Sequence, residues 1–391
     1  MTGFDAPDAP DAPDAPQPGG RGPAGAGNPV DWAVAERVAR WAARRKPAPT
    51  GYRVDDLRSE FEELTAQAEV LVARATGLQP PGPARARVAD RGDWVAVNVT
   101  SMRRLLAPTL GKVSERRLSA LPEGVPDWVP RTLSTAGRSV AGAQLGLVLG
   151  YMSTRVLGQY DLLLTEEGVD DQDIVYYVGP NVVEMEQRYG FEPREFRLWL
   201  ALHEVTHRCQ FTGVPWLRDH FVGLVDQALE AVAADPRRIL QAIRRAADSI
   251  RTGNTPLDDV GLIGLVATPE QLQALQRVQA LMSLLEGHGD VTMDRAGADA
   301  VPGAARFSEV LRERRQQVKG PAKLLQRLLG LEAKLRQYAE GERFVAAVES
   351  AGGAALFDRV WSGPGFLPSL AEIRSPGDWI ARVGPAPALA G

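Results

Sequence analysis

The stretch Leu198–Phe211, LWLALHEVTHRCQF, constrains the fold of this chain more than any other segment. It holds two of the four histidines in the 391 residues, four positions apart, and a glutamate directly follows the first one. The spacing of its apolar residues predicts a helix, in which positions i and i+4 share one face about 5–6 Å apart. His203 and His207 are therefore expected to point in the same direction from a single helical turn.

This pattern is typical of a catalytic zinc site. Neutral imidazoles bind Zn²⁺ at about 2.0–2.1 Å, so His203 and His207 could hold one ion. Glu204 lies about 100° further round the helix, beside the ion, where it could accept a proton from a water that zinc activates. The His-Glu-x-x-His arrangement thus supplies two ligands and a general base from one turn. The alternative is coincidence, because the pattern arises by chance in roughly one such chain in several hundred.

A catalytic zinc ion needs a third protein ligand and one open position. The candidates are Glu286, His288 and His220, and Glu286 is favoured. On a continuous helix Glu286 and Asp290 share a face, which matches the gluzincin arrangement of a glutamate ligand and an aspartate that accepts the other N–H of a ligand histidine. His288 points nearly opposite to Glu286 and stays an alternative. The two glycines that flank His288 could break the helix and redirect these side chains.

The histidine helix is expected to bury one side and to present the other to a cleft. Two neighbouring stripes follow from helical spacing: Leu198, Leu202, Val205 and Cys209 toward the core, and Phe196, Leu200, His203 and His207 toward the cleft. Cys209 is the single cysteine, and its place on the apolar stripe predicts a buried thiol rather than a metal ligand.

A strand is predicted just before this helix. Residues 173–181, DIVYYVGPN, are rich in β-branched and aromatic side chains and end at Gly-Pro, and LLLTEE at 162–167 is a candidate partner strand. An exposed edge of the 173–181 strand could hold an extended substrate backbone. Tyr176 and Tyr177 on the strand, together with His220 and His288, are candidates for stabilising an oxyanion.

The remainder of the chain favours helices. The first, from Asn28, carries Val30, Ala33, Val34, Val38 and Trp41 on one broad face. The uncharged run at 139–154 has 16 residues, fewer than the about 20 of a membrane span, and predicts a buried helix that packs closely through Gly142, Gly146 and Gly150. The predicted regions are a disordered Asp-Ala-Pro-rich tail at 1–28, a helical region at 29–160, the metal-site region at 161–300, and a helical, finally loop-rich region at 301–391.

Composition excludes several classes of function. The formal net charge is −4, so no basic excess indicates nucleic-acid binding. A single cysteine fits a reducing compartment, and the acidic, Pro-rich start is unlike a secretory signal. We therefore expect a cytoplasmic protein with no nucleic-acid or membrane partner, and the sequence says nothing of its oligomeric state.

Three segments also resemble a known family: FEPREFRLWLALHEVTHRCQFTGVPWLRDH, LLEGHGDVTMD and LPSLAEIRSPGDWIARV. They are similar to the zincin-like zinc-dependent metalloproteins of actinobacteria that are associated with biosynthesis of the deazaflavin coenzyme F-420. The resemblance covers roughly residues 28–385. It implies a mainly α fold with a small β-sheet (α+β), in which a zincin-like metallopeptidase core with its active-site helix is embedded in a helical bundle. It also implies that His203, Glu204 and His207 are the metal-binding and catalytic triplet.

The expected function is that of a zinc-dependent hydrolase, and specifically a metallopeptidase with one catalytic Zn²⁺ and Glu204 as general base. Its substrate would be a peptide or another amide. The alternative is a catalytically silent zincin-fold protein that binds a partner or assists biosynthesis of coenzyme F-420.

Overall fold

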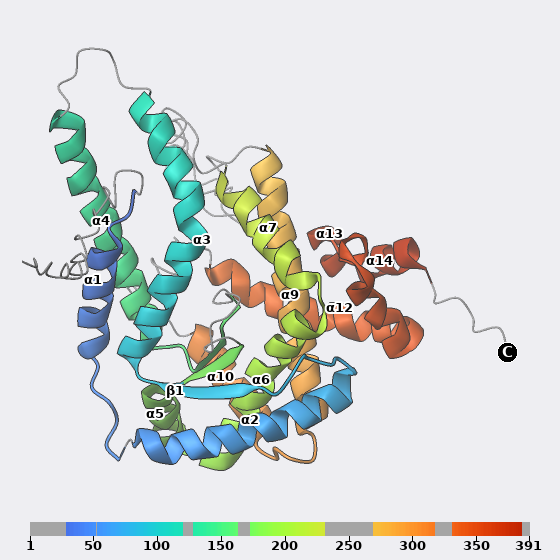
Figure 1. The fold of residues 1–391 in the computed structure, drawn as a ribbon. Helices are drawn as coiled ribbons and strands as arrows, with labels where there is room; N and C mark the ends of the chain where they lie inside the picture. The colour runs from blue at the N-terminus through green and yellow to red at the C-terminus, as the bar shows by residue number, and fades with distance from the viewer. Residues whose placement is uncertain are drawn as a thin grey trace, which may run out of the picture.

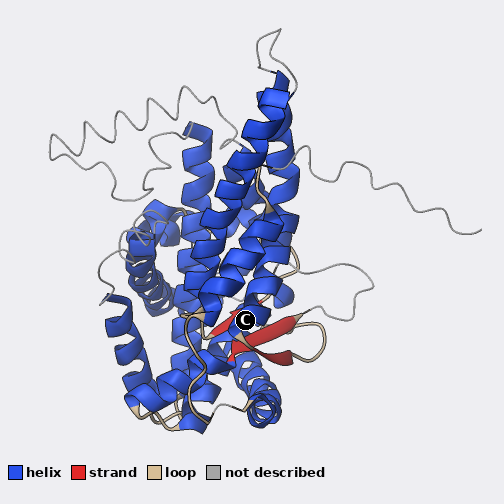
Figure 2. Cartoon of the chain, turned by 90° about the vertical axis from the view of Figure 1, so that its left-hand side faces the viewer, coloured by secondary structure: helices blue, strands red, loops and turns tan. Residues whose placement is uncertain are grey.

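The computed structural model describes residues 29–51, 53–119, 128–162, 173–230, 269–316 and 331–384. The predicted tail at 1–28 and most of the LLLTEE segment lie outside these residues. The fold is mainly helical with one small sheet, as predicted (Figure 1, Figure 2). In the described ranges, none of the helices combines the length and apolar character that a bilayer crossing requires.

Three helices of the N-terminal half, α1, α3 and α4, stand side by side, and α2 runs beneath them (Figure 1). The elements up to the sheet are α1 (Trp32–Arg44), α2 (Val54–Thr76), β1 (Arg85–Ala89), α3 (Arg91–Ser119), α4 (Trp128–Ser153), β2 (Gly158–Tyr160) and β3 (Ile174–Val178). The later elements are α5 (Gly179–Tyr189), α6 (Pro193–Gly213), α7 (Leu217–Glu230), α9 (Pro269–Gly297), α10 (Ala304–Gln316), α12 (Leu331–Phe357), η2 (Asp358–Ser362), η3 (Pro364–Phe366), α13 (Leu370–Arg374) and α14 (Pro376–Val383).

The sheet has the strand order β1-β3-β2, with β1 parallel and β2 antiparallel to β3. The predicted strand at 173–181 is therefore the middle strand, and the expectation that its own edge is exposed was wrong. It also ends earlier, at Val178, because Pro180 fits the first turn of a helix and α5 begins at Gly179. The free edge that lies against α6 belongs to β2 instead.

Alternating residues of β3 enter two different cores. Val175 and Tyr177 pack with side chains of α2 and α6 in the main hydrophobic core. Ile174 and Tyr176 pack on the opposite face, with Val97 of α3. The sheet is thus a layer between α3 on one face and the helices α2 and α6 on the other.

The contact between α1 and α4 confirms the predicted close packing through glycine. A Cβ at Gly146 would lie 2.5 Å from the carbonyl oxygen of Ala35, so only glycine permits this separation. The predicted buried face of α1 was partly wrong, because Trp41 is 49% exposed and its ring is covered by Arg45 at 3.9 Å. The buried residues of α1 are instead small: Ala35, Ala39 and Ala43. Two helices this close leave no room for an indole between them.

The helix α6 is buried on nearly all sides rather than along one stripe. The predicted core residues Leu198, Leu202, Val205 and Cys209 are buried, and so are Phe196 and Leu200 from the predicted cleft side. Phe196 packs against Phe191 and Phe307 of neighbouring elements. The two-stripe prediction failed here because α2, α9, α10 and the sheet all contact α6.

Candidate metal centre

The two histidines of α6 face one another at its centre. Glu192 accepts a hydrogen bond from the backbone N–H of Glu195 and Pro193 occupies the first turn, so the helix has a well-capped start. Ten residues on, the rings of His203 and His207 meet at 86°, and their Nε2 atoms are 3.3 Å apart. Both nitrogens therefore point into the same small volume.

The helix α9 brings a carboxylate to this volume. Glu286 Oε2 lies 3.9 Å from Nε2 of His203 and 3.6 Å from Nε2 of His207. The helix runs unbroken through Gly287 and Gly289, as the predicted orientation of Glu286 requires. Gly287 serves a different purpose, since a Cβ there would lie 2.1 Å from the backbone of Gly341 on α12. A Cβ at Gly289 would lie 3.6 Å from Cε1 of His207, which is an ordinary van der Waals contact.

The three side chains suit a zinc ion. One ligand atom from each of His203, His207 and Glu286 lies within 4.8 Å of the others. Two nitrogens at zinc–nitrogen distances of about 2.0–2.1 Å in tetrahedral geometry are separated by about 3.3–3.4 Å, which is the separation of the two Nε2 atoms here. Two imidazoles and one carboxylate are also the ligand set of known catalytic zinc sites.

The electrostatics of the site also favour a cation. Burial by itself lowers the pKa of His207, but the hydrogen bond and charge of Glu286, with the charge of Glu204, raise it to about 9. Two carboxylates therefore stabilise positive charge at the point where the histidines meet. A divalent ion supplies that charge without any protonation of the ring.

Glu204 stands beside the group and is held by the edge strand β2. Its Oε2 accepts a hydrogen bond of 3.1 Å from the backbone N–H of Tyr160. A Cβ at Gly158 would lie 2.7 Å from its Oε1, so the glycine leaves the room that the carboxylate occupies. Burial raises the pKa of Glu204 to about 7, with a further rise from Glu286, while His207 and the Tyr160 N–H oppose it.

Two residues behind the histidines were missed by the sequence argument. Gln210 Oε1 lies 3.0 Å from Nδ1 of His207, and Met293 Sδ lies 3.1 Å from Nδ1 of His203. Gln210 follows His207 by three residues, so helical spacing alone could have marked it as a neighbour. The role predicted for Asp290, as the acceptor behind a ligand histidine, stays a prediction.

Arg208, which the sequence argument also missed, ties the histidine helix to the sheet. Its guanidinium is fully buried and pairs with Asp173, at 2.5 Å, and with Glu69 of α2, at 2.6 Å. Asp173 precedes β3 and has a positive φ of 59°, which is uncommon outside glycine. Arg208 also donates to the carbonyl oxygen of Gly82 just before β1. The ion pairs thus hold α6, α2 and the sheet in one arrangement.

His288 and His220, the other predicted site histidines, lie elsewhere. His288 is buried with its ring stacked on Phe357, and its Nδ1 lies 2.9 Å from Gln210 Nε2. Its pKa is lowered to about 3, mainly by burial. His220 is half-buried on α7 against Trp216. The described residues therefore bring Glu286, and neither of these histidines, to the pair on α6.

The two tyrosines considered for an oxyanion are also separated by the sheet. The hydroxyl of Tyr177 is 2.7 Å from Oγ1 of Thr65, and its ring stacks on Phe61. Tyr176 lies on the face of the sheet that packs against α3. An oxyanion-stabilising role of either residue stays a prediction. Cys209 is a buried free thiol, as predicted.

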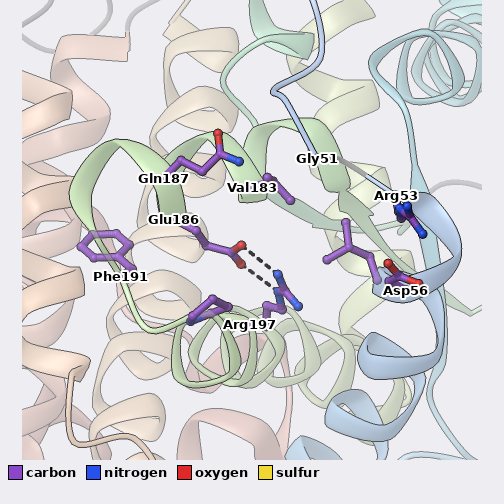
Figure 3. Close-up of a pocket in the computed structure, with 10 residues that line it drawn as sticks. Gly51, Arg53, Asp56, Val183, Glu186, Gln187, Phe191 and Arg197 are labelled. Atoms are coloured by element: carbon purple, nitrogen blue, oxygen red, sulfur yellow. Dashed lines mark hydrogen bonds and ion pairs between the residues drawn. The ribbon is translucent and has the colours of Figure 1, made fainter.

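A pocket of about 440 Å³ lies at the start of α6 rather than at the histidines. Two of its charged lining residues are already paired, since Arg197 donates twice to Glu186 at 2.8 Å (Figure 3). Arg197 also pairs with Glu60 of α2. Arg53 and Asp56 line the pocket as well. The pocket and the metal group therefore occupy different parts of the same helix.

Comparison with known proteins agrees with this geometry. The sequence pattern of a family described as zincin-like metallopeptidase matches residues 30–380. A solved structure from Chloroflexus aurantiacus, described as a candidate hydrolase with a novel fold, is 31% identical in sequence. It aligns with a TM-score of 0.64 over 90% of this chain and 98% of its own. No curated protein matches the chain.

Proposed function

This chain belongs to the zincin-like metallopeptidase family, and we propose that it is a zinc-dependent hydrolase that cleaves peptide or other amide bonds. The observation that carries the proposal is the group of His203, His207 and Glu286, with Glu204 near enough to interact with the charges of His207 and Glu286. His203 Nε2, His207 Nε2 and a Glu286 carboxylate oxygen would hold the ion. The description of the Chloroflexus structure as a candidate hydrolase supports the same class of reaction.

When bound, zinc polarises a carbonyl group and lowers the pKa of a water molecule toward about 7. In our proposal the water oxygen bonds to the carbonyl carbon of the substrate while the Glu204 carboxylate takes one water proton. Glu204 then delivers that proton to the leaving nitrogen as the C–N bond breaks, which yields a carboxylic acid and an amine. A pKa of Glu204 near 7 suits a group that must accept and then release a proton at neutral pH.

Substitution of the proposed base provides the test. Glu204→Gln should leave stoichiometric zinc, measured by elemental analysis, and should lower hydrolysis by at least about 100-fold. The probe is a mixture of peptides from a protein digest, with new termini read by mass spectrometry. Glu63→Gln, an exposed glutamate of α2, is the matched control and should cut as the wild type does. Equal hydrolysis by Glu204→Gln and the wild type would rule out this mechanism.

A second candidate function is that of an accessory protein without catalysis, linked to biosynthesis of coenzyme F-420 by the resemblance described above. The low exposure of the metal group favours this accessory function, since the side chains of His203 and His207 are only 20% and 15% exposed. This function predicts no cleavage of the peptide mixture by zinc-loaded protein and saturable binding of the coenzyme by fluorescence titration. Cleavage by the wild type, together with no binding of the coenzyme, would exclude it.

A further inference from the structure

Three side chains in contact, those of His207, Gln210 and His288, lead from the metal group to Phe357 in the hydrophobic core around α12. Gln210, one turn after His207 on α6, contacts His207 on one side and both Leu285 and His288 of α9 on the other. The distances between the hydrogen-bonding atoms in these three contacts are 2.9–3.0 Å. Gln210 is fully buried, so water cannot take over these contacts.

The orientation of the Gln210 amide follows from one of its partners. The carbonyl oxygen of Leu285 can only accept, so the Gln210 atom 2.9 Å from it must be the donating Nε2. Oε1 of Gln210 therefore faces Nδ1 of His207, at 3.0 Å. An amide oxygen can only accept, so the proton in that contact belongs to Nδ1 of His207.

The same reasoning sets the state of His288. Its Nδ1 lies 2.9 Å from the donating Nε2 of Gln210, so this nitrogen accepts and carries no proton. The ring stacks on Phe357 at 5.3 Å, in surroundings that favour the neutral form. Two fixed acceptors, a backbone carbonyl and a neutral imidazole, therefore hold the amide of Gln210 in one of its two orientations.

We propose that Gln210 is a positioning residue that keeps His207 protonated at Nδ1, so that Nε2 presents its lone pair to the metal. The proposal rests on the proposed function insofar as that lone pair serves zinc. In this proposal His288, a candidate metal ligand from its place in the sequence, does not bind the metal. It holds Gln210, which in turn holds the ligand His207. An imidazole whose other nitrogen is held by a fixed acceptor binds metal more tightly, and loss of such a partner typically costs about 10–100-fold in affinity.

Three variants test the proposal by zinc affinity, measured by competition with a chelator. Gln210→Leu should weaken zinc binding by about 10–100-fold. Gln210→Glu keeps an oxygen that accepts the His207 N–H but loses the donor to the Leu285 carbonyl and to His288, so its affinity should lie between those of Gln210→Leu and the wild type. Thr206→Val is the control, since Thr206 is equally buried on α6 but bonds only the Leu202 carbonyl of its own helix. It should bind zinc as the wild type does.

A spectroscopic measurement separates this inference from the proposed function. With four histidines in the chain, ¹⁵N-histidine labelling gives a spectrum that single variants can assign. A protected Nδ1–H of His207 should be present with and without zinc in the wild type, and should be lost in Gln210→Leu but kept in Thr206→Val. An unprotected Nδ1–H in the wild type, or zinc affinity of Gln210→Leu within about twofold of the wild type, would overturn the inference. A wild type that binds no zinc but keeps the protected N–H contradicts the proposed function and leaves the role of Gln210 in holding His207 intact.

Discussion

Glycine makes close approach possible in two regions of this molecule, but for different ends. Between α1 and α4 the glycines lie at Gly142, Gly146 and Gly150 and meet backbone and small apolar side chains. Around the metal group, Gly158 accommodates the Glu204 carboxylate, since a Cβ there would lie 2.7 Å from its Oε1. The first region gains only packing, whereas the second gives room to ionisable side chains that are costly to bury.

The same contrast holds for buried polar groups. The hydrophobic cluster where α1, α3 and α4 meet consists of alanine, valine, leucine and tryptophan side chains, and α3 and α4 also bury Arg91, Ser101 and Ser153. The surroundings of α6 bury Glu204, Arg208, Gln210, Glu286 and His288. Burial of such groups requires specific partners, so changes in the two regions should have different consequences.

The largest effect on stability is expected from Arg208→Met. It leaves Asp173 and Glu69 without their buried partner, and loss of one member of such a network typically costs about 3–5 kcal/mol. The free energy of unfolding in urea measures the change. Arg194→Met is the control, because Arg194 pairs with Glu63 at the surface and should cost far less. Equal losses for both variants would mean that the buried network contributes no more than a surface pair.

The next effect is expected in the α1–α4 region. Gly146→Ala places a Cβ 2.5 Å from a backbone oxygen of α1, and such overpacking typically costs about 1–3 kcal/mol. Zinc affinity should not change, because the metal group is on other helices. Gly223→Ala on α7 is the control, since no atom lies within 4 Å of its Cβ and alanine is favoured over glycine in a helix by about 0.5–1 kcal/mol. Destabilisation by Gly223→Ala as well would indicate a helix effect rather than a packing effect.

The pH dependence of stability should reveal the buried His288. Its pKa is about 3 in the folded chain, against an ordinary value of about 6.5, so between these values the unfolded chain binds a proton that the folded chain does not. His288 should therefore lower the free energy of unfolding by about 1 kcal/mol for each pH unit below about 6.5, while Glu204, whose pKa is raised to about 7 in the folded chain, opposes this fall because it binds its proton more tightly when folded.

His288→Asn, in which the amide oxygen can accept from Gln210, should remove the contribution of His288, so the free energy of unfolding of the zinc-free variant should rise relative to the wild type by about 1 kcal/mol for each pH unit below about 6.5. His220→Asn should alter it less, because His220 is only half-buried. Denaturation in urea at pH 7, 6 and 5 measures both slopes. An unchanged slope in His288→Asn would show that His288 does not stay neutral as the pH falls.

The smallest effect on stability, but a marked effect on function, is expected at Gly158. Gly158→Ala would push against the end of the Glu204 side chain, which can shift at a cost of about 1 kcal/mol or less. Zinc affinity should be kept, while hydrolysis of the peptide mixture falls. On a Glu204→Gln background the same change should have no further effect. A further loss there would mean that Gly158 acts on something other than Glu204.

Local chemistry in the sequence was enough to predict much of this protein. The spacing of His203 and His207 predicted a shared direction, the β-branched run predicted β3, and the glycines of α4 predicted a close helix contact. Glu286 was favoured over His288 because, on a continuous helix, Glu286 and Asp290 share a face and match the gluzincin arrangement. Each of these inferences depends on helix or strand geometry within one segment, which propensity and spacing determine.

Only the tertiary structure decided how the segments meet. The pattern of β3 is the same for a middle strand and an edge strand, because both faces of this strand are buried and only the pairing partner differs. Trp41 fits an apolar stripe, yet it is excluded once glycine and alanine bring α1 and α4 together. Gln210 of α6 binds Leu285 of α9, Met293 of α9 contacts His203 of α6, and Arg208 of α6 binds α2 and the start of the sheet. These long-range partners lie 35 to 139 positions away along the chain, beyond the reach of any local pattern.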